Sequence, residues 1–296
     1  MDILRYQIAG HFCEVAFDDV AYGESLMPSY APFRTTAEGS TLFRMTVDNA
    51  FRFTSKGKEV GQFDCGGHNF GVYLLDNGDY QFEISNEKGV LCAFLQANAA
   101  FTDNKVALVG NTSSECQFGL NNALMVVYAF AAAPYKTLLI HSSVVSQNGK
   151  GYLFLGVSGT GKSTHSRLWL KYIEGSELMN DDNPVVRIVD NEPRVYGSPW
   201  SGKTPCYRNV MAPIGGFVQL QQKPENKIRR AGVLDAFASL LPSVSTMKWD
   251  KVIYGQICDT ISDLIRLIPV YYLGCLPDEA AARLCHATVA LNEKQQ

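Results

Sequence analysis

The chain has 296 residues, of which 46% are hydrophobic and 19% charged, and its formal net charge is −3. This is an ordinary globular composition, with enough apolar material for one large domain or two ordinary ones. The weak negative charge and the lack of any long like-charge block exclude a basic nucleic-acid-binding stripe and a charged tail.

The cysteines and the apolar segments indicate the compartment. Eight cysteines are scattered along the chain without a C-x-x-C pair, which in a chain of this size predicts reduced thiols rather than a disulfide framework. The first residues lack a basic segment followed by an apolar one, and the longest apolar run, 123–133, is too short to span a bilayer. We therefore expect a cytoplasmic protein without a membrane partner.

The first part of the chain is predicted to be rich in β-strands. Segments 5–17, 41–47 and 80–84 alternate or carry β-branched and aromatic residues, and the turn residues at 76–79 and 86–89 predict hairpins. We expect residues 1–115 to form a β-rich N-terminal domain and residues 116–296 to form a second domain.

No chemistry is evident in this β-rich part. Cys65-Gly66-Gly67-His68 has the look of a metal site, but two ligands without a second pair make a weak one. His11 stands alone. The sequence leaves three roles open for this part: acceptor recognition, the interface of a homo-oligomer, or a cover for the neighbouring sheet.

A hairpin opens the second part of the chain. A helix is predicted over 119–133, ending at Pro134, and a strand over 137–145. Asn148-Gly149 then leads into a further strand at 152–155, and two strands joined by Asn-Gly favour an antiparallel hairpin.

The most informative motif follows that hairpin. Residues 156–164 read G-V-S-G-T-G-K-S-T and match G-x-x-x-x-G-K-[ST] without a mismatch, the pattern of a loop that cradles phosphates between a strand and a helix. A helix over 163–172 is predicted to follow, with Leu168, Trp169 and Tyr172 on its apolar face. Lys162 is expected to reach the β- and γ-phosphates, and the Ser163 hydroxyl to bind Mg²⁺. The expected nucleotide-binding residues are Gly156, Ser158, Gly159, Thr160, Gly161, Lys162, Ser163 and Thr164.

The remaining elements alternate strands with a helical end. Strands are predicted over 177–180, 185–189, 214–220 and 270–273. Helices are predicted over 233–241, 250–267 and 278–291.

Two acidic residues and one histidine add to the motif. Asp181-Asp182 ends the strand after the loop helix, where carboxylates serve as a metal ligand and as a base, although Asp-Asp-Asn-Pro also suits a solvated turn. His141 lies in an apolar strand, which is typical of a core histidine, yet the hairpin can bring it near the phosphates.

In this order, these residues resemble the family of HPr kinase/phosphorylase and phosphoenolpyruvate carboxykinase. The resemblance covers about residues 120–290 and includes Ile140-His141-Ser142-Ser143, the 156–164 motif, 178–182 and 197–203. It implies an α/β (α+β) fold in which a P-loop domain with a mixed sheet follows the β-rich domain. Thr164 departs from the family, which has an acidic residue there, so the resemblance does not imply that the acceptor is HPr.

The resemblance also implies roles for the matched residues. Asp181 is expected to act as the base and Asp182 as a metal ligand, with the reverse assignment left open. His141 and Lys162 are expected to support the transferring phosphoryl group. Lys203 and Arg208 are candidate charge-neutralising groups or ordinary solvated cations.

The predicted function is ATP- and Mg²⁺-dependent transfer of a γ-phosphoryl group to a hydroxyl of a protein, peptide or small molecule. The alternative is a regulatory module that binds ATP without transferring phosphate. The sequence does not identify the acceptor or distinguish ATP from GTP.

Overall fold

The structure is a computed structural model that describes residues 1–64, 69–202 and 204–290. The chain divides into two compact units. The first comprises Met1–Pro134 together with Met247–Tyr254, and the second comprises the rest. Each unit is built on its own mixed sheet, so the fold is mixed α/β.

The first unit contains an eight-stranded sheet in the order β1-β2-β3-β8-β7-β6-β5-β4. Its strands are β1 (Asp2–Ile8), β2 (His11–Phe17), β3 (Thr41–Val47), β4 (Lys58–Asp64), β5 (Asn69–Leu74), β6 (Tyr80–Ser85), β7 (Leu91–Ala97) and β8 (Asp103–Leu108). The predicted strand over 5–17 is two strands, because Ala9 and Gly10 form a turn with φ of 49° and 79°.

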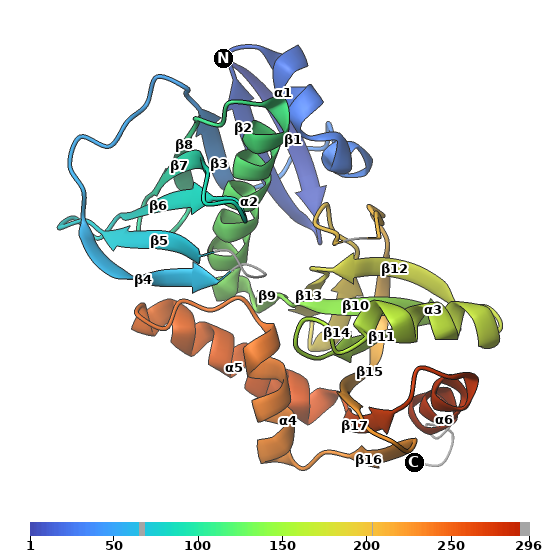
Figure 1. The fold of residues 1–296 in the computed structure, drawn as a ribbon. Coiled ribbons are helices and arrows are strands. Elements are labelled where there is room, and N and C mark those ends of the chain that lie inside the picture. The colour runs from blue at the N-terminus through green and yellow to red at the C-terminus, as the bar shows by residue number, and fades with distance from the viewer. Residues whose placement is uncertain (65–68, 203, 291–296) are drawn as a thin grey trace. The chain divides into compact units, whose positions relative to one another are not determined.

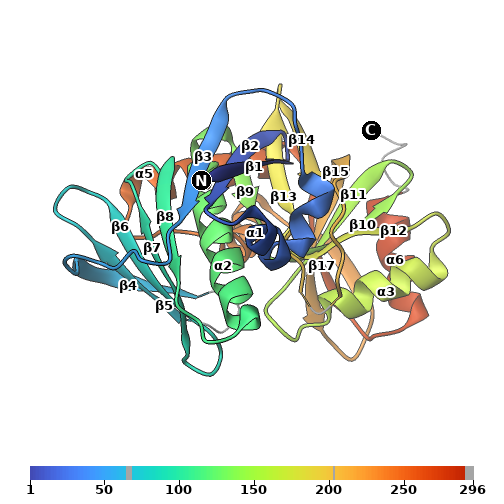
Figure 2. The same ribbon diagram turned by 90° about the horizontal axis from the view of Figure 1, so that it is seen from above.

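The helices of the first unit are α1 (Val20–Leu26), a 3₁₀ helix (Pro28–Phe33) and α2 (Ser113–Ala131). Helix α2 contacts β3, β6, β7 and β8 and lies along one face of this sheet (Figure 2). Its Phe130 ring lies 5.4 Å from that of Phe101. This packing carries the first unit to Pro134, beyond the boundary expected at residue 115.

The second unit contains a nine-stranded sheet in which β12-β10-β11-β15-β14-β13-β9 follow one another, β17 pairs with β15, and β16 pairs with β17 (Figure 1). Its strands are β9 (Thr137–Leu139), β10 (Ser142–Gln147), β11 (Lys150–Leu155), β12 (Glu177–Asp182), β13 (Val185–Val189), β14 (Glu192–Tyr196), β15 (Met211–Gln222), β16 (Lys227–Arg230) and β17 (Val270–Cys275). The α-helices of the later part of the chain are α3 (Lys162–Tyr172), α4 (Val233–Leu240), α5 (Lys251–Leu267) and α6 (Glu279–Val289). Two 3₁₀ turns, Ala133–Tyr135 and Leu241–Ser243, complete the set.

The predicted strand over 137–145 is interrupted at Ile140 and His141. Strand β9 pairs with β13, whereas β10 pairs with β11 and β12. Between β9 and β10 the chain therefore changes its pairing partners. At this point the His141 N–H donates a hydrogen bond to Ser243 O, at 2.6 Å, and not to a neighbouring strand. His141 therefore lies at a corner between two strands and not within a strand.

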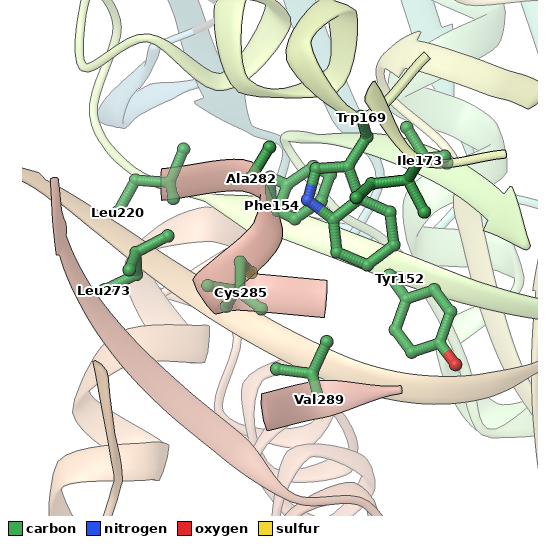
Figure 3. Packing of buried hydrophobic residues seen from close by; sticks show 11 residues of the cluster. Tyr152, Phe154, Trp169, Ile173, Leu220, Leu273, Ala282, Cys285 and Val289 are labelled. Atoms are coloured by element: carbon green, nitrogen blue, oxygen red, sulfur yellow. The ribbon is translucent and has the colours of Figure 1, made fainter. Parts of the chain in front are cut away.

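The hydrophobic core of the second unit holds α3 on the sheet. Trp169 is fully buried, and its ring lies 5.2 Å from Tyr152 and 5.4 Å from Phe154, both on β11 (Figure 3). Cys285 of α6 and Leu220 of β15 belong to the same cluster. The end of α3 is thereby fixed relative to the strand that precedes it.

The described part of the chain contains free cysteines, and it contains neither a metal-binding cluster nor a membrane-spanning helix. Each described cysteine is a free thiol. The predicted weak metal site at Cys65 to His68 lies outside the described residues. Among the residues that the structure describes, no group of three or more His, Cys, Asp or Glu side chains could hold a metal ion. None of the described helices combines the length and apolar character needed to cross a membrane.

Candidate functional site

A glycine-rich loop, residues 156–161, connects β11 to α3, as the motif predicts. Gly156, Gly159 and Gly161 have φ of 150°, 82° and 107°, values that residues with a Cβ rarely adopt. A Cβ on Gly156 would also lie 3.1 Å from the Thr160 Cβ. The loop conformation therefore depends on glycine at these positions.

The N-terminus of α3 lacks a side-chain cap. Its N-cap is Gly161, whereas the Thr112 hydroxyl caps α2 and the Asp278 carboxylate caps α6. The first turn of a helix has N–H groups without intrahelical acceptors, and they carry a partial positive charge. The start of α3 is thus suited to an anion that approaches from the loop.

Three side chains in or next to the loop donate hydrogen bonds to its backbone. The Thr160 hydroxyl donates to Val157 O at 2.7 Å, and the Lys162 Nζ donates to Gly156 O at 2.8 Å. Gln222, at the end of β15, donates from Nε2 to Gly159 O at 3.2 Å. Ser158 is exposed, and Thr164 accepts a long bond, 3.5 Å, from Arg167. Of the expected nucleotide-binding residues, Thr160 therefore uses its hydroxyl hydrogen for a bond within the loop.

Lys162 is nearly buried, with 9% of its surface exposed. Burial lowers the pKa of its ammonium group, and the charges of Asp182 and Asp181 oppose that shift. Both carboxylates therefore act electrostatically on the lysine, but desolvation has the larger effect on its pKa.

Asp181 is buried and faces the start of α3. Its Oδ1 accepts a 2.9 Å hydrogen bond from Ser163 Oγ. Its carbonyl oxygen accepts from the Gly202 N–H at 2.6 Å and from Ser201 Oγ at 3.1 Å. These bonds fix the carboxylate beside the serine of the motif.

Asp182 faces His141. Its Oδ1 lies 3.2 Å from His141 Nδ1, and the two side chains are 32% and 36% exposed. Asn183 Nδ2 donates to the other carboxylate oxygen at 2.7 Å. Burial raises the pKa of Asp182, opposed by the charges of His141 and Lys162. With φ of 144°, Asp182 also has a strained backbone, and a bridge to Ser201 supports it.

The register of β10 explains why these residues meet. Ser142 pairs with Asp182, and Ser143 pairs with both Asp181 and Phe154. Strand β10 thus lies between the strand that enters the loop and the strand that ends in the acidic pair. Because His141 precedes β10, it lies at the same edge. The antiparallel hairpin therefore brings the loop, both aspartates and the histidine together.

Arg208 binds at the other end of the strand that carries the acidic pair. Arg208 donates to Leu178 O at 2.6 Å and to Glu177 Oε2 at 2.8 Å. Glu177 and Leu178 lie at the start of β12, three to five residues, or about 10–17 Å, along the strand from Asp181 and Asp182. Arg208 thus binds the opposite end of β12 from the acidic pair, and Lys203 lies outside the described residues.

Sequence reasoning missed three contributors: Asn183, Ser201 and Gln222. Asn183 directly follows Asp182, and Ser201 lies in the 197–203 segment of the resemblance. Both could therefore have been found from their position next to predicted site residues. Gln222 carries no local signal, because only the parallel pairing of β15 with β11 brings it to the loop.

Comparison with known proteins finds similarity at the level of solved structures. No family model matches the sequence, and no curated protein matches it. Among solved structures, the HPr(Ser) kinase/phosphatase from Coxiella burnetii matches 53% of this chain and 95% of its own, with 13% identity and a TM-score of 0.31. At that similarity, any functional assignment depends on the chemistry of the site.

Proposed function

We propose that the protein is an ATP-dependent phosphotransferase that moves the γ-phosphoryl group to a hydroxyl of a protein, peptide or small molecule. The observation that carries the proposal is the pair of contacts at one sheet edge. Ser163 contacts Asp181 beside the loop, and His141 contacts Asp182 next to it. Nucleotide binding requires mainly the loop, whereas transfer also requires a base close to the phosphates.

The loop and Lys162 hold the phosphates in this proposal. The uncapped N–H groups of α3 face the phosphate oxygens, and Lys162 exchanges its bond to Gly156 O for a phosphate oxygen. Charge neutralisation and positioning supply most of the catalysis.

The oxygen pair formed by Ser163 and Asp181 fits Mg²⁺. A serine hydroxyl 2.9 Å from a buried carboxylate offers two hard ligands side by side. Magnesium takes one or two protein carboxylates and fills its other positions with water and substrate phosphate. When bound, Mg²⁺ neutralises charge on the β- and γ-phosphates.

This geometry favours the reverse of the expected roles for the two aspartates. Asp181 is fixed against Ser163, which suits a metal ligand, whereas Asp182 is partly exposed and oriented by His141 and Asn183. Asp182 then accepts the proton of the acceptor hydroxyl while the acceptor oxygen forms a bond to the γ-phosphorus. The bond from that phosphorus to the bridging oxygen breaks, and ADP leaves. His141 positions the Asp182 carboxylate.

Phosphorus NMR of the full chain with Mg²⁺-ATP tests the proposal, with free serine and a cell extract as the acceptor pool. We expect a new phosphoester signal that Asp182→Asn abolishes. Asp190→Asn is the matched control, since Asp190 lies exposed in the turn between β13 and β14. Nucleotide binding without any new product in the wild-type sample would favour the ATP-binding module instead.

A further inference from the structure

Two buried polar side chains, Asn180 and Ser198, lie beside the acidic end of β12, and neither is exposed to solvent. The Asn180 Nδ2 donates to Ser198 Oγ at 3.1 Å and to Trp200 O at 3.2 Å. The Ser198 Oγ also accepts from the Trp200 N–H at 3.2 Å, and it donates to Asn183 O at 2.6 Å. These two side chains therefore join the segment around Trp200 to β12 and to the residue after the acidic pair.

The segment from Ser198 to Gly202 holds the backbone on both sides of Asp182. Before this aspartate, Asp181 O accepts from the Gly202 N–H at 2.6 Å. After it, Asn183 O accepts from Ser198 Oγ. The segment also packs closely here, because a Cβ on Gly202 would lie 3.2 Å from the Asp182 Cβ. The peptide groups that flank Asp182 are thus both bound to one neighbouring segment.

The conformation of Asp182 requires such support. Its φ of 144° is a value that residues with a Cβ rarely adopt, and it persists only where the surrounding structure imposes it. With this backbone, Asp182 Oδ1 lies 3.2 Å from His141 Nδ1. Strained backbone of this kind is concentrated at active sites. The hydrogen bonds around Ser198 therefore fix the place of a carboxylate that belongs to the candidate site.

Asn180 is a costly residue at this position. Its Oδ1 is buried without a hydrogen-bond partner, and an unpaired buried acceptor lowers the stability of a fold. The role of this asparagine is therefore carried by the N–H groups of its amide, which bind Ser198 and Trp200.

We infer that Asn180 and Ser198 are positioning residues for Asp182. They act on its backbone and not on a substrate, because both side chains are fully buried. The inference rests on the proposed function, in which Asp182 accepts the proton of the acceptor hydroxyl, and it adds the residues that hold this carboxylate in place. A small displacement of a reacting group slows transfer steeply, whereas the phosphate contacts at the loop stay as they are.

Three variants disturb this support in different ways. Ser198→Ala and Asn180→Ala remove the hydrogen bonds from the segment to β12 and to Asn183 O. Gly202→Ala leaves every hydrogen bond in place, and its new Cβ forces Asp182 to shift by a few tenths of an ångström. Since Gly202 is exposed, this third variant tests the inference even if the two buried variants fail to fold.

The control is Ser239→Ala. Ser239 is also a buried serine of the second unit, and its hydroxyl makes two hydrogen bonds of 2.8 Å, to Asp235 O and Tyr272 Oη. It lies on α4, away from the acidic pair. Loss of its hydroxyl therefore reproduces the structural cost of a buried serine without changing the neighbourhood of Asp182.

The readout separates the transfer rate from ATP binding. The rate of phosphoester formation at saturating Mg²⁺-ATP is measured with free serine and a cell extract as the acceptor pool, and calorimetry gives the Kd of Mg²⁺-ATP. We expect the three variants to lose at least about tenfold in rate and to keep the Kd within about threefold of the wild type. The control is expected to keep both values.

Three results would contradict the inference. An unchanged rate in Gly202→Ala, or an equal fall in Ser239→Ala, would overturn it and leave the proposed function in place. A loss of ATP affinity as large as the loss of rate would indicate a general structural role and would also overturn it. Absence of product in the wild type with every acceptor would overturn the proposed function and this inference together.

Discussion

Ser163 and Asp181, separated by 18 positions in the chain, are joined by a hydrogen bond of 2.9 Å. Ser163 is the second residue of α3, and Asp181 is the last residue but one of β12. Their contact links the phosphate side of the site to its acidic side.

Replacing Lys162 with alanine is expected to weaken ATP binding without unfolding the protein. A bond from a charged donor to a phosphate contributes about 1.5–3 kcal/mol, or about tenfold to a hundredfold in Kd. Burial already lowers the pKa of this lysine, so removing its charge relieves a desolvation cost. Calorimetry and thermal melting measure the two effects. Lys171→Ala, an exposed lysine on the same helix, is the control, and a large drop in Tm for Lys162→Ala alone would contradict the placement.

Trp169 is expected to be essential for stability. It is fully buried against Tyr152 and Phe154, and an alanine there leaves a cavity that costs about 3–5 kcal/mol. Urea unfolding followed by circular dichroism measures the loss. Leu170→Ala, at a position that is 38% exposed on the same helix, is expected to cost less than about 1 kcal/mol. Equal losses for both variants would contradict the packing of α3.

Glu14 is expected to make the stability of the first unit depend on pH. The hydrogen bond from Arg5 is the largest of several effects that together lower its pKa to about 2; Arg44 and Thr41 add to the shift, and burial opposes it. A carboxyl group whose pKa is lower in the folded state than in the unfolded state stabilises the fold at pH values above the unfolded-state pKa of about 4.3. This stabilisation is lost as the pH falls towards about 2. Because solvent screens the two partly exposed arginines, we expect Glu14 to contribute only about 1–2 kcal/mol to the free energy of unfolding.

Urea unfolding at about pH 6 and about pH 3 measures that dependence. Glu14→Gln is expected to lose less stability than wild type over this interval, because it has no carboxylate to protonate. Glu38→Gln, at an exposed position of the same unit, is expected to follow the wild type. A Glu14→Gln curve parallel to that of the wild type would argue against the ion pairs.

The predictable parts of the fold are those with a local signal. The strands at Thr41–Val47 and Val185–Val189 have the predicted bounds, because their apolar pattern ends at turn residues. Strand β14 and strand β16 were not predicted. Proline and charged residues occupy them, and their pairing partners, not their own composition, make them strands.

The site shows the same division. The glycines and Lys162 lie within one motif, so a single segment predicts the loop. The corner at His141 and the contact of Gln222 with the loop depend on which strands pair, which is a property of the whole sheet. The sequence also left the two aspartates interchangeable, because adjacent carboxylates differ only in what surrounds them.

The most direct test of the account separates binding from transfer in those two aspartates. Phosphoester formation and ATP affinity, with and without Mg²⁺, are measured in the same samples of wild type, Asp181→Asn and Asp182→Asn. We predict that Asp181→Asn loses the gain in ATP affinity that Mg²⁺ provides, and that Asp182→Asn keeps this gain but forms no product. The opposite pattern would contradict the assigned roles, and absence of product in the wild type with every acceptor would contradict phosphotransfer itself.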